Sequence, residues 1–152
     1  MTREKRIEQL GRLARHQSDL ALAELRACEQ RLAEQKSRHE QLANYMQEYA
    51  QSLEFAQGGK AGAFAIQNYR AFMARIESAV EQQQRNVEAV RRELEELRAR
   101  FKEASIHARS VEKLHGRVRD EVRSEQEKRE QRELDAHATQ RALHRPSLAG
   151  GE

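Results

Sequence analysis

The chain has 152 residues, enough for one ordinary domain. Apolar residues make up only 38% of it, against roughly 45–50% in typical soluble domains, which argues against a compact globule with a large core. The net charge is +3, and the acidic and basic residues alternate finely along the chain. Nucleic-acid binding needs clustered cations, so we expect no nucleic-acid partner.

Residues 2–56 are predicted to form a first helix, because apolar and small residues recur at alternating steps of three and four. This spacing presents one stripe, here called the heptad seam, to a partner helix. The predicted seam residues are Ile7, Leu10, Ala14, Gln17, Ala21, Leu25, Cys28, Leu32, Gln35, His39, Leu42, Met46, Tyr49, Leu53 and Ala56. An extra step of four between Ala21 and Leu25 indicates a local phase shift.

Residues 57–62 (QGGKAG) contain three glycines and are predicted to form a turn. A second helix over about 64–140 follows, in which fifteen of seventeen seam positions are apolar over eight heptads. These positions are Ile66, Tyr69, Met73, Ile76, Val80, Gln83, Val87, Val90, Leu94, Leu97, Phe101, Ala104, Ala108, Val111, His115, Val118 and Val122. Residues 145–152 are predicted to be a flexible tail.

Two seamed helices joined by a short turn predict an all-α fold, a long two-helix antiparallel coiled-coil hairpin that forms a single domain over 1–152. With the turn centred near Gly59, facing residues have numbers that sum to about 118, twice that of the central glycine. Leu25 is then expected near Leu94, and Tyr49 near Tyr69. The alternative is a structural homodimer in which each arm pairs with another chain and the glycines form only a kink.

Six of the seven aromatic residues lie between residues 45 and 72. In the predicted register Tyr45 and Phe72 lie beside the seam, which needs only one apolar residue at each position. A two-helix hairpin has no third layer to cover them. Two interpretations stay open: a wider seam that stiffens the hairpin near the turn, or a docking patch, because contiguous exposed apolar area marks an interface.

Catalytic and metal chemistry have no basis in the sequence. The six histidines contain no pair at the i, i+4 spacing of a helical metal site, and a two-helix hairpin has no pocket to perturb the pKa of a carboxylate. The glycine-rich turn lacks the Lys-Ser/Thr ending of a phosphate-binding loop. We therefore expect no metal, no cofactor and no enzymatic activity.

The single cysteine and the absence of long apolar runs bear on location. Cys28 occupies a seam position, where a small packing role is expected, and a lone cysteine fits a reducing compartment. No apolar run approaches the roughly 18 residues that span a bilayer, and the N-terminus lacks the apolar core of a signal peptide. We expect a cytosolic protein without direct membrane insertion.

Four ordered segments of the chain resemble the FliJ family of flagellar type III export proteins. They are LANYMQEY at 42–49, NYRAFMARIESAVEQQ at 68–83, RARFKEAS at 98–105 and EKREQRELDAHA at 127–138. The resemblance implies a coiled coil similar to the shaft of rotary ATPases, which couples the flagellar export ATPase ring to the cytoplasmic linker of the membrane export gate. It also implies binding of flagellar export chaperones, and a location at the cytoplasmic side of the cell membrane through the export apparatus.

The same resemblance assigns site residues. The export-gate surface it implies consists of Leu42, Tyr45, Tyr49, Phe72, Ile76, Ala79 and Gln83. Arg38 stands where a glutamine is familiar in the family, and Gln83 where a histidine can occur, so the edge of the surface differs while its aromatic centre matches. The ATPase-facing residues it implies are Ile7, Leu10, Leu13, Val118 and Val122.

Overall fold

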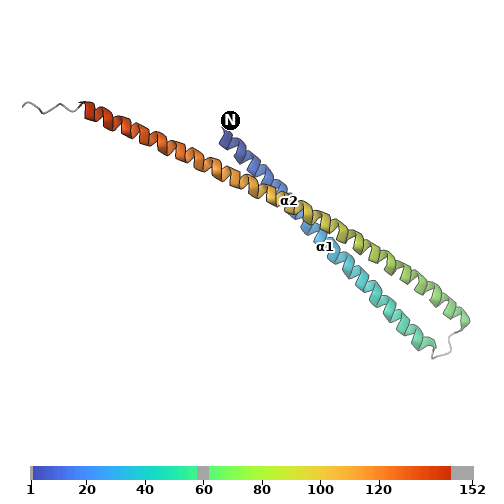
Figure 1. Ribbon diagram of the computed structural model, residues 1–152. Helices are drawn as coiled ribbons and strands as arrows, with labels where there is room; N and C mark the ends of the chain where they lie inside the picture. Colours follow the sequence, from blue (N-terminus) through green and yellow to red (C-terminus); the bar gives the residue numbers. More distant parts are fainter. Residues whose placement is uncertain (1, 58–61, 145–152) are drawn as a thin grey trace, which may run out of the picture. The chain divides into compact units, whose positions relative to one another are not determined.

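The computed structural model describes residues 2–57 and 62–144. Over these residues the chain forms two long α-helices, α1 (Arg3–Gln57) and α2 (Ala63–His144), which pack against each other as an antiparallel hairpin without any strand (Figure 1). Three of the four predicted helix ends are correct to within one residue, whereas α2 ends four residues beyond the predicted position 140. Residues 58–61 of the predicted turn (57–62), the predicted tail at 145–152 and the side chains of 55–57 lie outside the described residues.

At the start of each helix, a backbone amide donates a hydrogen bond to the residue that precedes the helix. The Lys5 amide donates to the Thr2 hydroxyl oxygen at 3.4 Å, which makes Thr2 an N-cap for α1. In α2 the Ile66 amide donates to the Gly62 carbonyl oxygen at 3.2 Å. The last turn of α2 carries Arg141 and His144, where a cation stabilises the helix dipole.

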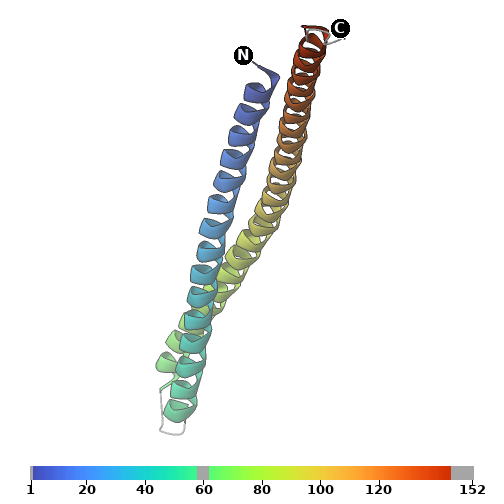
Figure 2. The ribbon, with the colours of Figure 1, turned by 90° about the vertical axis from the view of Figure 1, so that its left-hand side faces the viewer.

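The chain divides into two compact units, residues 1–15 with 106–152, and residues 16–105. Within the second unit the two helical segments lie side by side and run in opposite directions (Figures 1 and 2). Its core is a cluster of Leu25, Cys28, Leu94 and Leu97, in which Cys28 is 0% exposed. This confirms Cys28 as a small packing residue of the seam.

The helix register in the unit of residues 16–105 is the predicted one. The Cys28 thiol donates to the Val90 carbonyl oxygen at 3.8 Å, and the Tyr49 ring stacks on the Tyr69 ring with centroids 5.2 Å apart. Both pairs of residue numbers sum to 118, which confirms the predicted pairing of Tyr49 with Tyr69.

An exposed ion pair joins the two helices beside this seam. The Arg31 guanidinium donates two hydrogen bonds, of 3.1 and 2.8 Å, to the Glu93 carboxylate. These hydrogen bonds lower the pKa of the Glu93 carboxyl below its ordinary value and raise the pKa of Arg31. A folded-state pKa below the unfolded value means that this pair stabilises the hairpin at neutral pH, and that its contribution disappears as the pH falls through the folded-state pKa.

In the unit of residues 1–15 with 106–152, the start of α1 packs against the middle of α2. Ile7 and Ala14 of α1 are buried, as are Ala108 and Val118 of α2. From Arg119 to His144 every residue of α2 is exposed, so this segment buries no side chain of its own in the described structure.

The first turns of α1 differ from the prediction. Leu10 and Gln17 were expected in the seam but are exposed, whereas Gly11 and Ser18 are partly buried. The seam of this segment consists of Ile7, Gly11, Ala14, Ser18, Ala21 and Leu25. Steps of four and three then alternate without the predicted phase shift, so that prediction was wrong. Unbroken pairing favours a continuous stripe, even where the stripe contains a glycine and a serine in place of larger residues.

We expect Gly11→Ala to stabilise the protein. A Cβ atom at Gly11 would lie 3.7 Å from Cγ1 of Val111, which is ordinary van der Waals contact, and alanine is better than glycine in a helix by about 1 kcal/mol. Urea unfolding followed by circular dichroism is expected to show a gain of about 0.5–1 kcal/mol. Gly116→Ala, with nothing within 4 Å of the new Cβ, is the control for propensity alone. A loss of stability in Gly11→Ala only would contradict the close packing of residue 11 described here.

Candidate docking surface

Four aromatic side chains from both helices form a continuous cluster around Tyr49. The Tyr49 ring centroid lies 5.2 Å from that of Tyr69 in a stacked arrangement and 4.6 Å from that of Phe72 in a tilted one. Tyr45, one helical turn earlier in α1, lies 6.1 Å from Tyr49. These separations are typical of favourable ring pairs, so the cluster ties the helices together as well as presenting aromatic surface.

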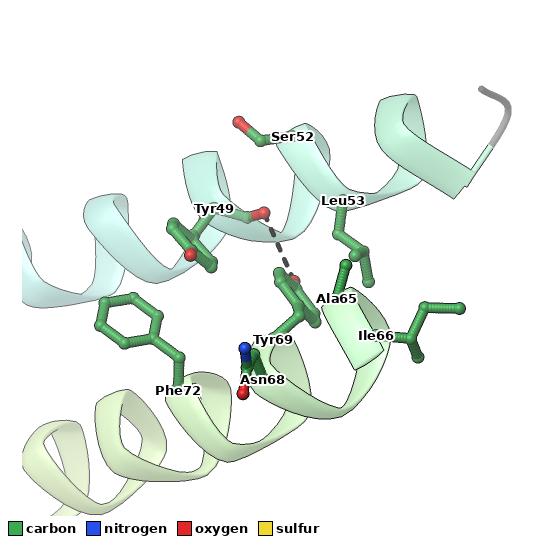
Figure 3. Close-up of a pocket in the computed structure, with 8 residues that line it drawn as sticks. All are labelled: Tyr49, Ser52, Leu53, Ala65, Ile66, Asn68, Tyr69 and Phe72. Carbon is green, nitrogen blue, oxygen red and sulfur yellow. Dashed lines mark hydrogen bonds between the residues drawn. The ribbon is translucent and has the colours of Figure 1, made fainter. Parts of the chain in front are cut away.

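A hydrogen bond locks one end of the cluster. The Tyr69 hydroxyl donates to the backbone carbonyl oxygen of Tyr49 at 3.3 Å (Figure 3). Burial raises the pKa of the Tyr69 phenol above its ordinary value, and the nearby Tyr49 and Glu54 raise it further. Tyr69 was predicted as a seam residue, and its half-buried position confirms this.

A cavity of about 560 Å³ opens beside the cluster between α1 and α2. Its walls are formed by Tyr49, Ser52, Leu53, Ala65, Ile66, Asn68, Tyr69 and Phe72 (Figure 3). A two-helix hairpin was expected to have no pocket, and this cavity corrects that expectation. One residue in the sequence could have indicated the cavity. Ala65 faces Leu53 in the register in which residue numbers sum to 118, and its small side chain leaves space between the helices.

A second hollow, of about 420 Å³, is formed mainly by residues that precede Tyr45 in the chain. It is lined by Arg38, Gln41, Leu42, Tyr45 and Gln83. Leu42, Tyr45 and Gln83 of the predicted export-gate surface therefore line this hollow, whereas Tyr49 and Phe72 line the larger cavity. The rim contains one cation, Arg38, at the position where the chain departs from the family resemblance.

The predicted export-gate residues differ in how far they reach the surface. Tyr45 is 48% exposed and Ala79 is exposed, whereas Leu42, Tyr49 and Phe72 are half-buried. Ile76 and Gln83 are buried, so these two residues of the predicted export-gate surface are not exposed in the described structure. Their other predicted place, in the heptad seam, is confirmed. What a partner can touch is therefore centred on Tyr45, with Tyr49 and Phe72 beside it.

A polar layer in the seam adjoins this surface. The Gln83 side-chain amide donates to the Gln35 carbonyl oxygen at 3.0 Å and to the Gln35 side-chain oxygen at 2.6 Å, and Asn86 donates to Gln83 at 3.4 Å. Buried polar groups are costly unless they are hydrogen-bonded, so only a register that brings Gln35 to Gln83 satisfies them. Nδ1 of His39, one turn away, is buried without a hydrogen-bond partner among the described residues.

The residues predicted to face an ATPase also divide into two groups. Leu10 and Leu13 are exposed and line a shallow groove with Arg6 and Gln9. Ile7 and Val118 are buried in the seam of their unit, and Val122 is exposed. Ile7 and Val118 therefore pack between the helices in the described structure, and their contact with the ATPase stays a prediction.

The described residues contain neither a candidate metal-binding cluster nor a membrane-spanning stretch. Over residues 2–57 and 62–144, no three His, Cys, Asp or Glu side chains are grouped so that they could hold a metal ion. Neither described helix contains a stretch long and apolar enough to cross a membrane. What the geometry offers is apolar and aromatic surface suited to a protein partner.

Comparison with known proteins gives one match. The sequence model of the family described as "Flagellar FliJ protein" matches residues 3–147. No curated protein and no solved structure matches the chain.

We expect a spectrophotometric titration of the tyrosines to contain one component with a pKa above the ordinary value of 10.0, because burial disfavours the Tyr69 phenolate. Tyr69→Phe is expected to remove that component and to lower the melting temperature, since the hydrogen bond to Tyr49 is lost. The control Tyr45→Phe is expected to leave the component in place. If the component with the raised pKa is still present in Tyr69→Phe, Tyr69 is not the buried, hydrogen-bonded ring described here.

Proposed function

This chain belongs to the FliJ family and is a flagellar export-associated protein, and from that premise we propose that it couples the export ATPase ring to the membrane export gate without enzymatic activity of its own. In this proposal the aromatic cluster docks on the cytoplasmic linker of the gate. The protein also binds flagellar export chaperones and is held at the cytoplasmic side of the membrane through the export apparatus, two points that rest on the family resemblance.

The observation that carries the gate proposal is the half-exposed Tyr45 beside Tyr49 and Phe72. An aromatic side chain can bury about 150–250 Å² in an interface, and tyrosine keeps a polar hydroxyl for the aqueous state. Such anchors supply most of the binding energy in protein interfaces. Leu42 and Ala79 extend the surface at its edges. The buried Ile76 and Gln83 pack in the seam beneath the surface.

The ATPase contact is supported by different residues. Leu10 and Leu13 are large apolar side chains that remain exposed in the unit formed by residues 1–15 and 106–152. They lie on α1, at the end of the helix opposite to Tyr45, so the gate and the ATPase bind different residues of one helix. A protein that couples two partners needs such separate contact sites.

The alternative of a structural homodimer unrelated to export has less support. The seam of the unit of residues 16–105 is filled by α1 and α2 of a single chain, so the fold needs no second chain to bury its core. Membership of the FliJ family places the protein with the flagellar export components.

Substitution of the aromatic anchors tests the gate proposal. We expect Tyr45→Ala combined with Phe72→Ala to weaken binding to a purified gate linker by roughly 100-fold or more, because each truncated hot spot costs about 2 kcal/mol. Calorimetry or biolayer interferometry measures this loss, and circular dichroism checks that helicity is kept. Binding to the export ATPase is expected to survive, because Leu10 and Leu13 are unchanged.

Phe64→Ala is the matched control, because Phe64 is an aromatic residue of α2 that is 78% exposed and lines neither hollow. It is expected to bind the gate like the unaltered protein. Tyr45→Ala alone, which leaves Phe72 in place, is expected to weaken binding about thirtyfold. Unchanged gate binding in the double variant would rule out the docking role of the aromatic cluster.

A further inference from the structure

Helix α1 exposes three leucines that neither the seam nor the aromatic cluster uses. Leu10, Leu13 and Leu20 are 55%, 54% and 53% exposed. Leucines exposed to this extent at helical spacing form an apolar stripe that a further helix can cover. An exposed charged residue continues the stripe at each end. We call the whole series the outer stripe; it consists of Arg6, Leu10, Leu13, Gln17, Leu20 and Glu24.

The outer stripe has the spacing of a coiled-coil contact. Its members follow one another at alternating steps of four and three, as in a heptad seam. Each lies one position before a residue of the α1 seam, which is about 100° around the helix, so the outer stripe flanks the seam and is exposed beside it. It is therefore available to a further helix while the hairpin stays intact.

The outer stripe is also its own complement. Its residue numbers are mirrored about position 15, so an antiparallel copy places Leu10 opposite Leu20 and Leu13 opposite Gln17. The same pairing places Arg6 opposite Glu24. A two-fold axis repeats every pair, so leucines meet leucines at two layers and opposite charges meet at both ends. A parallel copy would instead place Arg6 against Arg6 and Glu24 against Glu24, where like charges repel.

We propose that the outer stripe is a self-association surface, on which a second copy of this chain binds antiparallel about a two-fold axis near position 15. The mirrored arrangement of leucines and opposite charges singles out this occupant, since a different protein would not require the stripe to match itself. Three leucines on each side bury less than the roughly 1,200–2,000 Å² of a stable interface, so the dimer is weak and reversible.

Self-association is independent of the proposed role in export, because it rests on α1 alone. It has one consequence for that role. Leu10 and Leu13 are the exposed leucines assigned to the ATPase contact, so a second copy and the ATPase compete for them. Binding of a second copy and binding of the ATPase then exclude each other at these residues.

Sedimentation equilibrium over a concentration series tests the proposal on the full chain. The weight-average mass is expected to rise from 17.7 kDa at low concentration toward twice this value. Gln17→Leu is expected to lower the dissociation constant about tenfold. The substituted side chain faces Leu13 of the other copy, and the two-fold axis makes this apolar contact twice. Gln47→Leu, at an exposed position of α1 outside the outer stripe, is the matched control and is expected to leave the constant unchanged.

Charge exchange tests the antiparallel pairing itself. Arg6→Glu and Glu24→Arg are each expected to raise the dissociation constant about tenfold, because each replaces two attractive contacts with two repulsive ones. The double variant is expected to restore the original constant. Circular dichroism shows that each variant keeps its helicity. A protein that stays monomeric even with Gln17→Leu, or a double variant that does not recover, would overturn the proposal.

Discussion

The pairing of α1 and α2 along one narrow seam is the constraint on which the structure depends. Packing supplies most of the stability of a helix, and here the packing is concentrated at Leu25, Cys28, Leu94 and Leu97. Cys28 at the centre is fully buried, so its small side chain sets how closely the helices approach. Residues outside the seam are free to take on other roles.

The register fixed by this seam has functional consequences. It brings Tyr49 to Tyr69 and Gln35 to Gln83, and these pairs would be lost together if one helix slipped along the other. A polar pair in a coiled-coil seam favours one register at some cost in stability. In this protein that register assembles the aromatic cluster from residues of both helices, and it is the cluster that we propose binds the export gate.

How much the sequence predicts differs between the helices. In α2 the seam is almost entirely apolar, so periodicity and the glycine-rich turn were enough to predict the fold and register. In the first turns of α1 the seam contains Gly11 and Ser18. A prediction based on apolar residues therefore assigned the larger Leu10 to the seam in place of Gly11. Ile76 was assigned both to the heptad seam and to the export-gate surface, and only the three-dimensional packing shows that it is buried. The cavity beside Ala65 depends on unfilled volume, which no periodicity reports.

Pairing within a single chain is the central claim, and cross-linking tests it most directly. In a Cys28→Ala background, Leu25→Cys and Leu94→Cys place two thiols in the same core cluster. A short bis-maleimide reagent at low protein concentration is expected to join the two sites within one chain, which peptide mapping by mass spectrometry identifies at the monomer mass. Cross-links found only between different chains would show that the arms pair between molecules and would contradict the hairpin.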